Sequence, residues 1–140
     1  MYPDALNVPY VRDLIGVPYK VHGRSIEEGF DCYGLMIEIF ARAGIKIPDA
    51  FYEETTIAEN MKNYHILRNL VEEGMSLVPV EVPQKMSIVC IAMTGKEVSH
   101  VGVYIGEGMI IHSLQGYGVC VEPLAKYQYK VKGYYVIGNR

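Results

Sequence analysis

The sequence predicts an α+β fold in which N-terminal helices, one of them bearing a cysteine, pack on a C-terminal antiparallel β-sheet. Helical periodicity runs through the first half of the 140 residues. The second half is a series of short β-branched and aromatic runs, separated by glycine, proline or charged turns. Helices followed by strands, rather than alternating with them, are typical of α+β domains. No repeat, linker or low-complexity tract divides the chain, so we expect a single domain over residues 1–140.

Three helices are expected from capping residues and apolar stripes. Residues 9–16 begin with a proline, which suits the first helical position, and end at a glycine. The clearest helix follows Asp31, a good N-cap, and ends at Gly44. Its apolar face comprises Cys32, Leu35, Met36, Ile39, Phe40 and Ala43. A third helix is expected over about residues 56–73, where a threonine and a glutamate three positions later form a capping box.

Six strands are expected after the helices, because each segment is short, rich in β-branched or aromatic residues, and bounded by turn residues. They cover residues 77–82, 86–93, 99–106, 109–114, 118–124 and 133–138. Short connections between consecutive strands favour an antiparallel meander, which the helices would cover.

Composition and charge argue against several classes of protein. The formal net charge is −3 and no basic run is present, which argues against a nucleic-acid partner. No apolar run approaches the ~18–20 residues of a membrane span. The three cysteines are widely spaced, which argues against a disulfide framework or a CxxC zinc site. The N-terminus lacks a secretory signal, so we expect the chain to be cytoplasmic as synthesised.

Cys32 lies in the first turn of the clearest helix, directly after Asp31. Unpaired backbone N–H groups and the helix macrodipole favour negative charge at this end, so a thiolate is stabilised there. The thiolate is the nucleophilic form of cysteine, which makes Cys32 a candidate catalytic residue. Alternatively, Cys32 completes the apolar stripe as a small hydrophobic side chain. Cys90 and Cys120 lie in strand-like runs and are expected to be buried structural thiols.

Two histidines lie on the arms of a predicted β-hairpin that turns at residues 106–108. A symmetric register places His100 and His112 nearly opposite each other on one face. His100 would accept the proton of Cys32, and His112 would orient the far ring nitrogen of His100. Gly102 shares that face and would let the cysteine helix pack close to the histidine. A polar pair on a solvated face is the alternative interpretation.

Cys32, His100 and His112 could instead bind zinc, because a thiolate and two imidazoles leave an open coordination position. The sequence lacks the HxxxH and CxxC spacings that accompany many zinc sites. We therefore expect a catalytic triad of these three residues, with no metal ligands and no cofactor.

The motifs around these residues resemble those of a known family. Residues 16–48 read GVPYKVHGRSIEEGFDCYGLMIEIFARAGIKIP, and residues 99–124 read SHVGVYIGEGMIIHSLQGYGVCVEPL. Pro-Tyr before a glycine loop, Gly-Phe-Asp-Cys-x-Gly-Leu at a helix start and Ser-His-Val-Gly-x-Tyr-x-Gly before a later histidine resemble the NlpC/P60 family of papain-like cysteine peptidases. The resemblance implies a cysteine-bearing helix on an antiparallel sheet. It also implies hydrolysis of peptidoglycan stem peptides, typically between the γ-carboxyl of D-glutamate and a following diamino acid.

The resemblance also implies roles for individual residues. The family's catalytic cysteine, histidine and third polar residue match Cys32, His100 and His112. Tyr19 matches a tyrosine that helps to hold the oxyanion, and Asp31 matches an aspartate that meets the free amine of the substrate. Tyr33 stands where wall-lytic relatives commonly carry a substrate-binding serine, so we expect Tyr33 at the substrate site.

The Asp-Cys-Tyr-Gly-Leu sequence in a compact chain resembles the tail-associated branch that phages and prophages encode. In that branch the particle delivers the enzyme to the cell wall. The expected partners are therefore the peptidoglycan stem peptide and phage tail proteins. Two alternatives remain: an acyltransferase or other amidase that uses the same triad, and a non-catalytic structural component of the tail.

Overall fold

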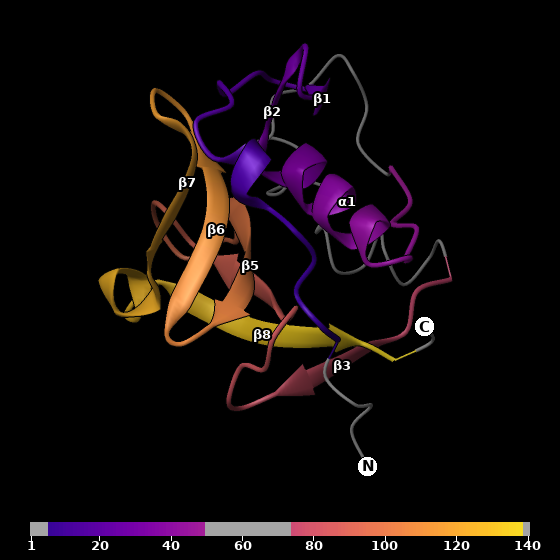
Figure 1. The fold of residues 1–140 in the computed structure, drawn as a ribbon. Helices are drawn as coiled ribbons and strands as arrows, with labels where there is room; N and C mark the ends of the chain where they lie inside the picture. Colours follow the sequence, from indigo (N-terminus) through magenta and orange to yellow (C-terminus); the bar gives the residue numbers. More distant parts are fainter. Residues whose placement is uncertain (1–5, 50–73, 139–140) are drawn as a thin grey trace.

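The computed structural model describes residues 6–49 and 74–138, which form a helix packed on a sheet (Figure 1). The described part of the chain holds one α-helix, α1 (Cys32–Arg42), and a six-stranded sheet. The sheet strands are β3 (Leu77–Val80), β4 (Ile88–Ile91), β5 (His100–Gly106), β6 (Met109–Leu114), β7 (Gly118–Pro123) and β8 (Val131–Ile137). The smaller elements are β1 (Arg24–Ser25), β2 (Gly29–Phe30) and the 3₁₀ turns η1 (Arg12–Leu14) and η2 (Leu124–Tyr127). The predicted α+β architecture is confirmed.

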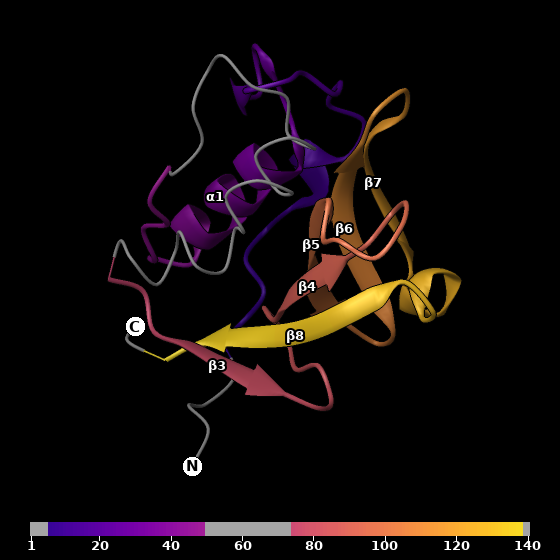
Figure 2. The ribbon, with the colours of Figure 1, turned by 180° about the vertical axis from the view of Figure 1, so that it is seen from behind.

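The six strands lie in the order β3-β8-β4-β5-β6-β7, and every neighbouring pair is antiparallel. Strands β4 to β7 form the expected meander, since each is the sheet neighbour of the strand that follows it. The last strand, β8, departs from the meander because it returns to lie between β3 and β4 (Figure 2). All six strand predictions are confirmed, with ends that differ by no more than two residues.

Helix α1 packs against β5 and β6 and carries Cys32 at its N-terminus. The Asp31 side chain accepts a hydrogen bond from the Gly34 backbone at 2.6 Å, as an N-cap should. Its buried apolar side chains are Leu35, Met36, Ile39 and Phe40. The Ser113 hydroxyl of β6 donates to the Phe30 carbonyl at 2.7 Å. This bond fixes the chain two residues before Cys32 to the strand that carries His112.

The other two helix predictions have different outcomes. Residues 9–16 form only the single 3₁₀ turn η1 rather than an α-helix. The reason is a pair of backbone hydrogen bonds to β7, in which the Gly16 N–H donates to the Val119 carbonyl and the Val119 N–H to the Val17 carbonyl. The helix expected at about residues 56–73 lies outside the described residues. Within residues 6–49 and 74–138, no helix has both the length and the apolar character needed to cross a membrane.

Gly34 lets the start of α1 approach the loop beside it, and we expect Gly34→Ala to destabilise the fold. An added Cβ would lie 2.1 Å from the Gly23 carbonyl oxygen and 2.8 Å from Arg24 Nη1. Overpacking of this kind costs about 1–3 kcal/mol, which outweighs the ~1 kcal/mol by which alanine favours a helix over glycine. Urea unfolding measures the change.

Ala41→Gly is the matched control, because it changes helix propensity in α1 at an exposed position. It should cost about 0.5–1 kcal/mol without any steric effect. A Gly34→Ala protein that is more stable than the parent would show that the loop beside α1 yields without cost.

Candidate active site

A cleft of about 940 Å³ lies beside the start of α1. Its lining includes Cys32, His100 and Tyr19, three of the residues singled out from the sequence. The remaining lining residues are Val21, Met93, Thr94, Ser99, Ser113, Leu114, Gln115, Tyr117, Cys120, Glu122, Lys126 and Tyr127. The helix start and the β5–β7 face therefore meet in one cavity, as the triad prediction requires.

The Cys32 thiol is almost fully buried, with 2% of the residue exposed. Burial is the largest influence on its pKa and, together with the negative charge of Asp31, raises it to about 12. Backbone hydrogen bonds from Val101 and Tyr33 to the sulfur lower the pKa, but by less. The prediction that the helix start stabilises a resting thiolate is therefore wrong, because burial outweighs the helix terminus. The bond from Val101 places the sulfur beside the residue that follows His100.

His100 and His112 contact each other directly, with His100 Nε2 and His112 Nδ1 2.9 Å apart. Both residues are buried, from neighbouring strands β5 and β6. The hairpin register pairs Val103 with Ile111, so the two histidines are diagonal neighbours rather than directly opposite. An added Cβ on Gly102 would lie 3.3 Å from the Cβ of His112. Gly102 therefore makes room for His112, rather than for α1 as predicted.

Glu122 extends this pair into a chain of three side chains. Its Oε1 atom lies 2.8 Å from His112 Nε2 and accepts a 2.6 Å hydrogen bond from the Tyr127 hydroxyl. Lys126 pairs with the other carboxylate oxygen. Burial alone would raise the pKa of Glu122, but the bonds from Lys126, Tyr127 and His112 together lower it to about 2. Glu122 is therefore ionised at neutral pH and can only accept hydrogen bonds.

An acceptor-only carboxylate fixes the protons on both rings. Glu122 can contact His112 Nε2 at 2.8 Å only if that nitrogen carries a proton. The pKa of His112 is lowered, chiefly by burial, so the ring is neutral and its Nδ1 is an acceptor. His100 Nε2 must then be the donor in the 2.9 Å contact. His100 Nδ1 is left without a proton, and it is the nitrogen available to face Cys32 as a base.

Tyr19 lies on the cleft wall, half-buried, where its hydroxyl can serve as a donor. Burial and the charges of Cys32 and Asp31 raise its pKa to about 12. The hydroxyl therefore keeps its proton at neutral pH. A parallel bridge to Phe30 fixes the Tyr19 backbone beside the segment that leads into α1.

The structure gives Asp31 and Tyr33 structural positions. Asp31 is fully buried and accepts hydrogen bonds from the His22 backbone, the Gly34 backbone and the Arg24 guanidinium. Tyr33 is also fully buried, and its hydroxyl donates to the Pro48 carbonyl. Neither residue belongs to the described lining of the cleft. Both side chains hold the helix start, and their contact with substrate stays a prediction.

The sequence predicted the environment of Cys90 correctly, but not that of Cys120 or the role of Glu122. Cys90 is buried as expected, whereas Cys120 is half-buried and lines the cleft beside Glu122. Glu122 was missed. The signal for it was the strand alternation that puts Cys120 and Glu122 on one face of β7, since β7 pairs His112 with Cys120.

Comparisons with known proteins find relatives in both sequence and fold. The sequence matches the NlpC/P60 family over residues 16–137. It is 30% identical over 129 residues to the gamma-DL-glutamyl hydrolase of Bacillus subtilis (strain 168), covering 89% of this chain and 27% of that protein. It is 31% identical over 93 residues to the tail tip assembly protein K of Escherichia phage lambda, covering 66% and 46%. The fold is similar to the crystal structure of an NlpC/P60 family protein from Bacillus cereus ATCC 10987, with a TM-score of 0.59, 27% identity, and coverage of 92% and 40%. The chain thus spans less than half the length of each of these relatives.

The buried histidines should make the fold less stable as the pH falls. Burial first, and then the neighbouring His112, lowers the pKa of His100 from 6.5 to about 3. Between pH 6.5 and 5 the unfolded chain therefore takes up a proton that the folded protein does not. The free energy of unfolding should fall with pH, by up to about 1.4 kcal/mol per pH unit for each such histidine.

Urea unfolding of the parent and of His100→Gln between pH 6.5 and 5 measures this slope. The variant should have a shallower pH dependence than the parent, because it lacks one of the two buried rings. Identical slopes would mean that His100 is protonated in the folded protein.

Proposed function

The chain belongs to the NlpC/P60 family, and from this premise we propose that it is a cysteine peptidase acting on peptidoglycan stem peptides. The observation that carries the proposal is a cleft lined by both Cys32 and His100, in which His100 is hydrogen-bonded to His112 and His112 in turn to Glu122. Relatives of this chain are a gamma-DL-glutamyl hydrolase and a muramidase/DL-endopeptidase, both of Bacillus subtilis. We propose the bond between the γ-carboxyl of D-glutamate and a diamino acid as the one cleaved, with residues 1–140 acting as one catalytic domain.

The proposed reaction has two halves. His100 Nδ1 accepts the thiol proton of Cys32 while the sulfur bonds to the carbonyl carbon of the substrate. The carbonyl then reforms as the C–N bond breaks, and the amine leaves with the proton from His100. In the second half, His100 takes a proton from water, and the resulting hydroxide displaces the sulfur. The acyl group is released as a carboxylic acid, which loses its proton to solvent, and the sulfur recovers its proton from His100.

Two hydrogen-bond donors near Cys32 are candidates for an oxyanion hole. The backbone N–H of Cys32 belongs to the first turn of α1, whose unpaired N–H groups favour negative charge. The Tyr19 hydroxyl shares the cleft with Cys32 and keeps its proton. We propose that these two groups stabilise the tetrahedral intermediate. Cys32, His100 and His112 thus keep their predicted roles in the proposal, as does Tyr19.

The cleft lining carries polar groups that a peptide could use. Hydroxyl and amide groups of Thr94, Ser99, Gln115 and Tyr117 line it together with the charged pair of Glu122 and Lys126. An acyltransferase or other amidase built on the same triad is the alternative, and turnover of wall peptides distinguishes the two possibilities.

A second proposal concerns the setting in which the domain works. Similarity to the tail tip assembly protein K of phage lambda favours a phage tail as the carrier that brings the enzyme to the cell wall. The partners would then be tail proteins in addition to the stem peptide. A non-catalytic tail component is the alternative, and turnover of wall peptides separates the two.

We expect Cys32→Ala to abolish hydrolysis and to leave the fold intact, because the variant removes only the attacking sulfur. Mass spectrometry of a purified peptidoglycan digest, treated with parent or variant, identifies the new termini and hence the bond. Cys90→Ala is the matched control, since Cys90 is a buried thiol outside the described cleft lining. A Cys32→Ala protein that releases the same fragments at the parent's rate would exclude Cys32 as the nucleophile.

We expect Glu122→Gln to lower kcat by roughly 10²-fold, the contribution of a well-placed general base, with a smaller effect on KM. A glutamine amide can donate to His112 Nε2, so His100 Nδ1 is no longer held free of a proton. Steady-state kinetics on a stem-peptide substrate from pH 5 to 9 measures both constants.

Tyr127→Phe is the control, because it removes another bond to the same carboxylate oxygen while leaving an acceptor-only group against His112. Its kcat should stay much closer to that of the parent, because Glu122 still pairs with Lys126 and remains an ionised, acceptor-only group. Equal losses of kcat in the two variants would argue for general loosening of β7 instead of control over the ring protons.

A further inference from the structure

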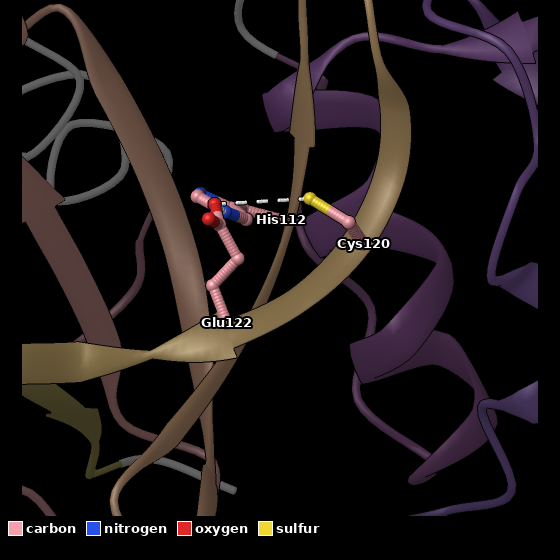
Figure 3. A group of neighbouring side chains, drawn as sticks. All are labelled: His112, Cys120 and Glu122. Atoms are coloured by element: carbon pink, nitrogen blue, oxygen red, sulfur yellow. Dashed lines mark hydrogen bonds and ion pairs between the residues drawn. The ribbon is translucent and has the colours of Figure 1, made fainter. Parts of the chain in front are cut away.

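Three potential metal ligands of different chemistry converge at the side of the cleft. His112 Nε2, Cys120 Sγ and a carboxylate oxygen of Glu122 all lie within 4.8 Å of one another. Figure 3 shows the Cys120 and Glu122 side chains, both from β7, directed toward His112. The strand register explains the convergence, since His112 pairs with Cys120 and Glu122 lies two residues further on the same face.

The spacing is close to that of a tetrahedral zinc site. Zn–N and Zn–O bonds of about 2.0–2.1 Å and Zn–S bonds of about 2.3 Å put neighbouring ligand atoms roughly 3.3–3.7 Å apart. Here Glu122 Oε1 lies 2.8 Å from His112 Nε2 and 3.8 Å from Cys120 Sγ. The third pair, His112 and Cys120, lies within 4.8 Å, so side-chain shifts on the order of 1 Å would bring the ligand atoms to the spacing of a zinc site. A thiol, an imidazole and a carboxylate together suit zinc rather than magnesium or calcium, which prefer oxygen ligands alone.

We propose that His112, Cys120 and Glu122 bind a Zn²⁺ ion, and that the bound ion switches off the base His100. The ion would take its fourth ligand from the cleft, which Cys120 and Glu122 both line. This set differs from the zinc set considered in the sequence, which comprised Cys32, His100 and His112. The binding site stands on geometry alone, whereas the switch rests on the proposed peptidase function.

The switch follows from counting protons. Without metal, His112 Nε2 carries a proton for Glu122, and His100 Nε2 donates to His112 Nδ1. Zn²⁺ at His112 Nε2 displaces that proton to solvent, and Cys120 releases its thiol proton on binding the ion. The neutral His112 ring then takes its proton at Nδ1 from His100 Nε2, and the 2.9 Å hydrogen bond reverses. His100 acquires a proton from solvent at Nδ1, so it presents a donor instead of a base to Cys32.

Two side chains compete with the metal for Glu122. The Lys126 ammonium pairs with one carboxylate oxygen, but its side chain is 59% exposed and can turn into solvent. Tyr127 donates to the other oxygen and can keep that bond beside a metal, because a carboxylate has several acceptor positions. Removal of the ammonium by Lys126→Gln should therefore tighten metal binding, by about two- to fivefold if it equals the effect of an exposed ion pair.

Binding is tested first in the Cys32→Ala protein, where the proposed nucleophile cannot hold the ion. Calorimetry with Zn²⁺ should give one equivalent, and Co²⁺ should give the near-ultraviolet band of a thiolate-bound ion. Cys120→Ser or Glu122→Gln in the same background should weaken binding at least about tenfold, and Cys120→Ser should remove the band. A missing band in Cys32→Ala, or unchanged affinity in both double variants, would overturn the site.

The switch is tested by peptidase activity of the parent and of Cys120→Ser, each with EDTA or with Zn²⁺ at concentrations that fill the site. With the activity of each protein in Zn²⁺ expressed relative to its own activity in EDTA, Cys120→Ser should be at least about tenfold less sensitive to Zn²⁺. Equal inhibition of the two proteins would refute the switch. A parent that is inactive even in EDTA would refute the peptidase proposal and with it the switch, while the binding measurement would still decide the metal site.

Discussion

A single proton lies between His100 Nε2 and His112 Nδ1. If it is bonded to His100 Nε2, then Nδ1 of the neutral His100 ring is free to act as a base in the cleft. Two nitrogens 2.9 Å apart can share only one hydrogen bond of this kind, so the two rings cannot choose their protons independently. Glu122 breaks the symmetry because its carboxylate requires a proton on the near nitrogen of His112. A residue on β7 thereby controls the chemistry of a ring on β5, two strands away.

Backbone geometry makes this contact possible. The β5–β6 register shifts between Tyr104 and Gly106, next to the hairpin turn, and leaves the two histidines diagonal to each other. Diagonal neighbours on one face are within reach of each other for long side chains, and the absent side chain of Gly102 leaves room for the Cβ of His112. The hydrogen bond from Ser113 to the Phe30 carbonyl then ties β6 to the entry of α1. Strand β6 therefore both carries His112 and anchors the segment that leads to Cys32.

Local sequence patterns predicted the elements whose structure depends on interactions between residues close together in the chain. The cap at Asp31, the apolar stripe of α1 and the alternation of the hairpin each depend on residues a few positions apart, and each is present in the structure. Contacts between distant segments were not predictable in this way. Residues 9–16 contain a good helical pattern, but backbone pairing with β7 overrides it. Asp31 caps the helix as expected, but it also forms an ion pair with Arg24. That ion pair was not predictable from the sequence, because it depends on how β1 and β2 pair.

Two effects act in opposite directions on the pKa of Cys32, and the larger one determines its protonation state. The helix start favours the thiolate, whereas burial favours the thiol. A helix terminus stabilises a charge by about 0.3–1 kcal/mol, and by ~2 kcal/mol in favourable buried geometries. Removing an ion from water costs several kcal/mol even after the protein relaxes, so the buried sulfur keeps its proton and its pKa rises to about 12. Burial acts on His100 in the opposite direction and holds the ring neutral. Because both residues rest uncharged, the proposed mechanism requires the thiolate to form only as the sulfur attacks, when the charge would move on to a carbonyl oxygen. A resting thiol is also less readily oxidised than a thiolate, so the burial that keeps Cys32 protonated also protects its sulfur.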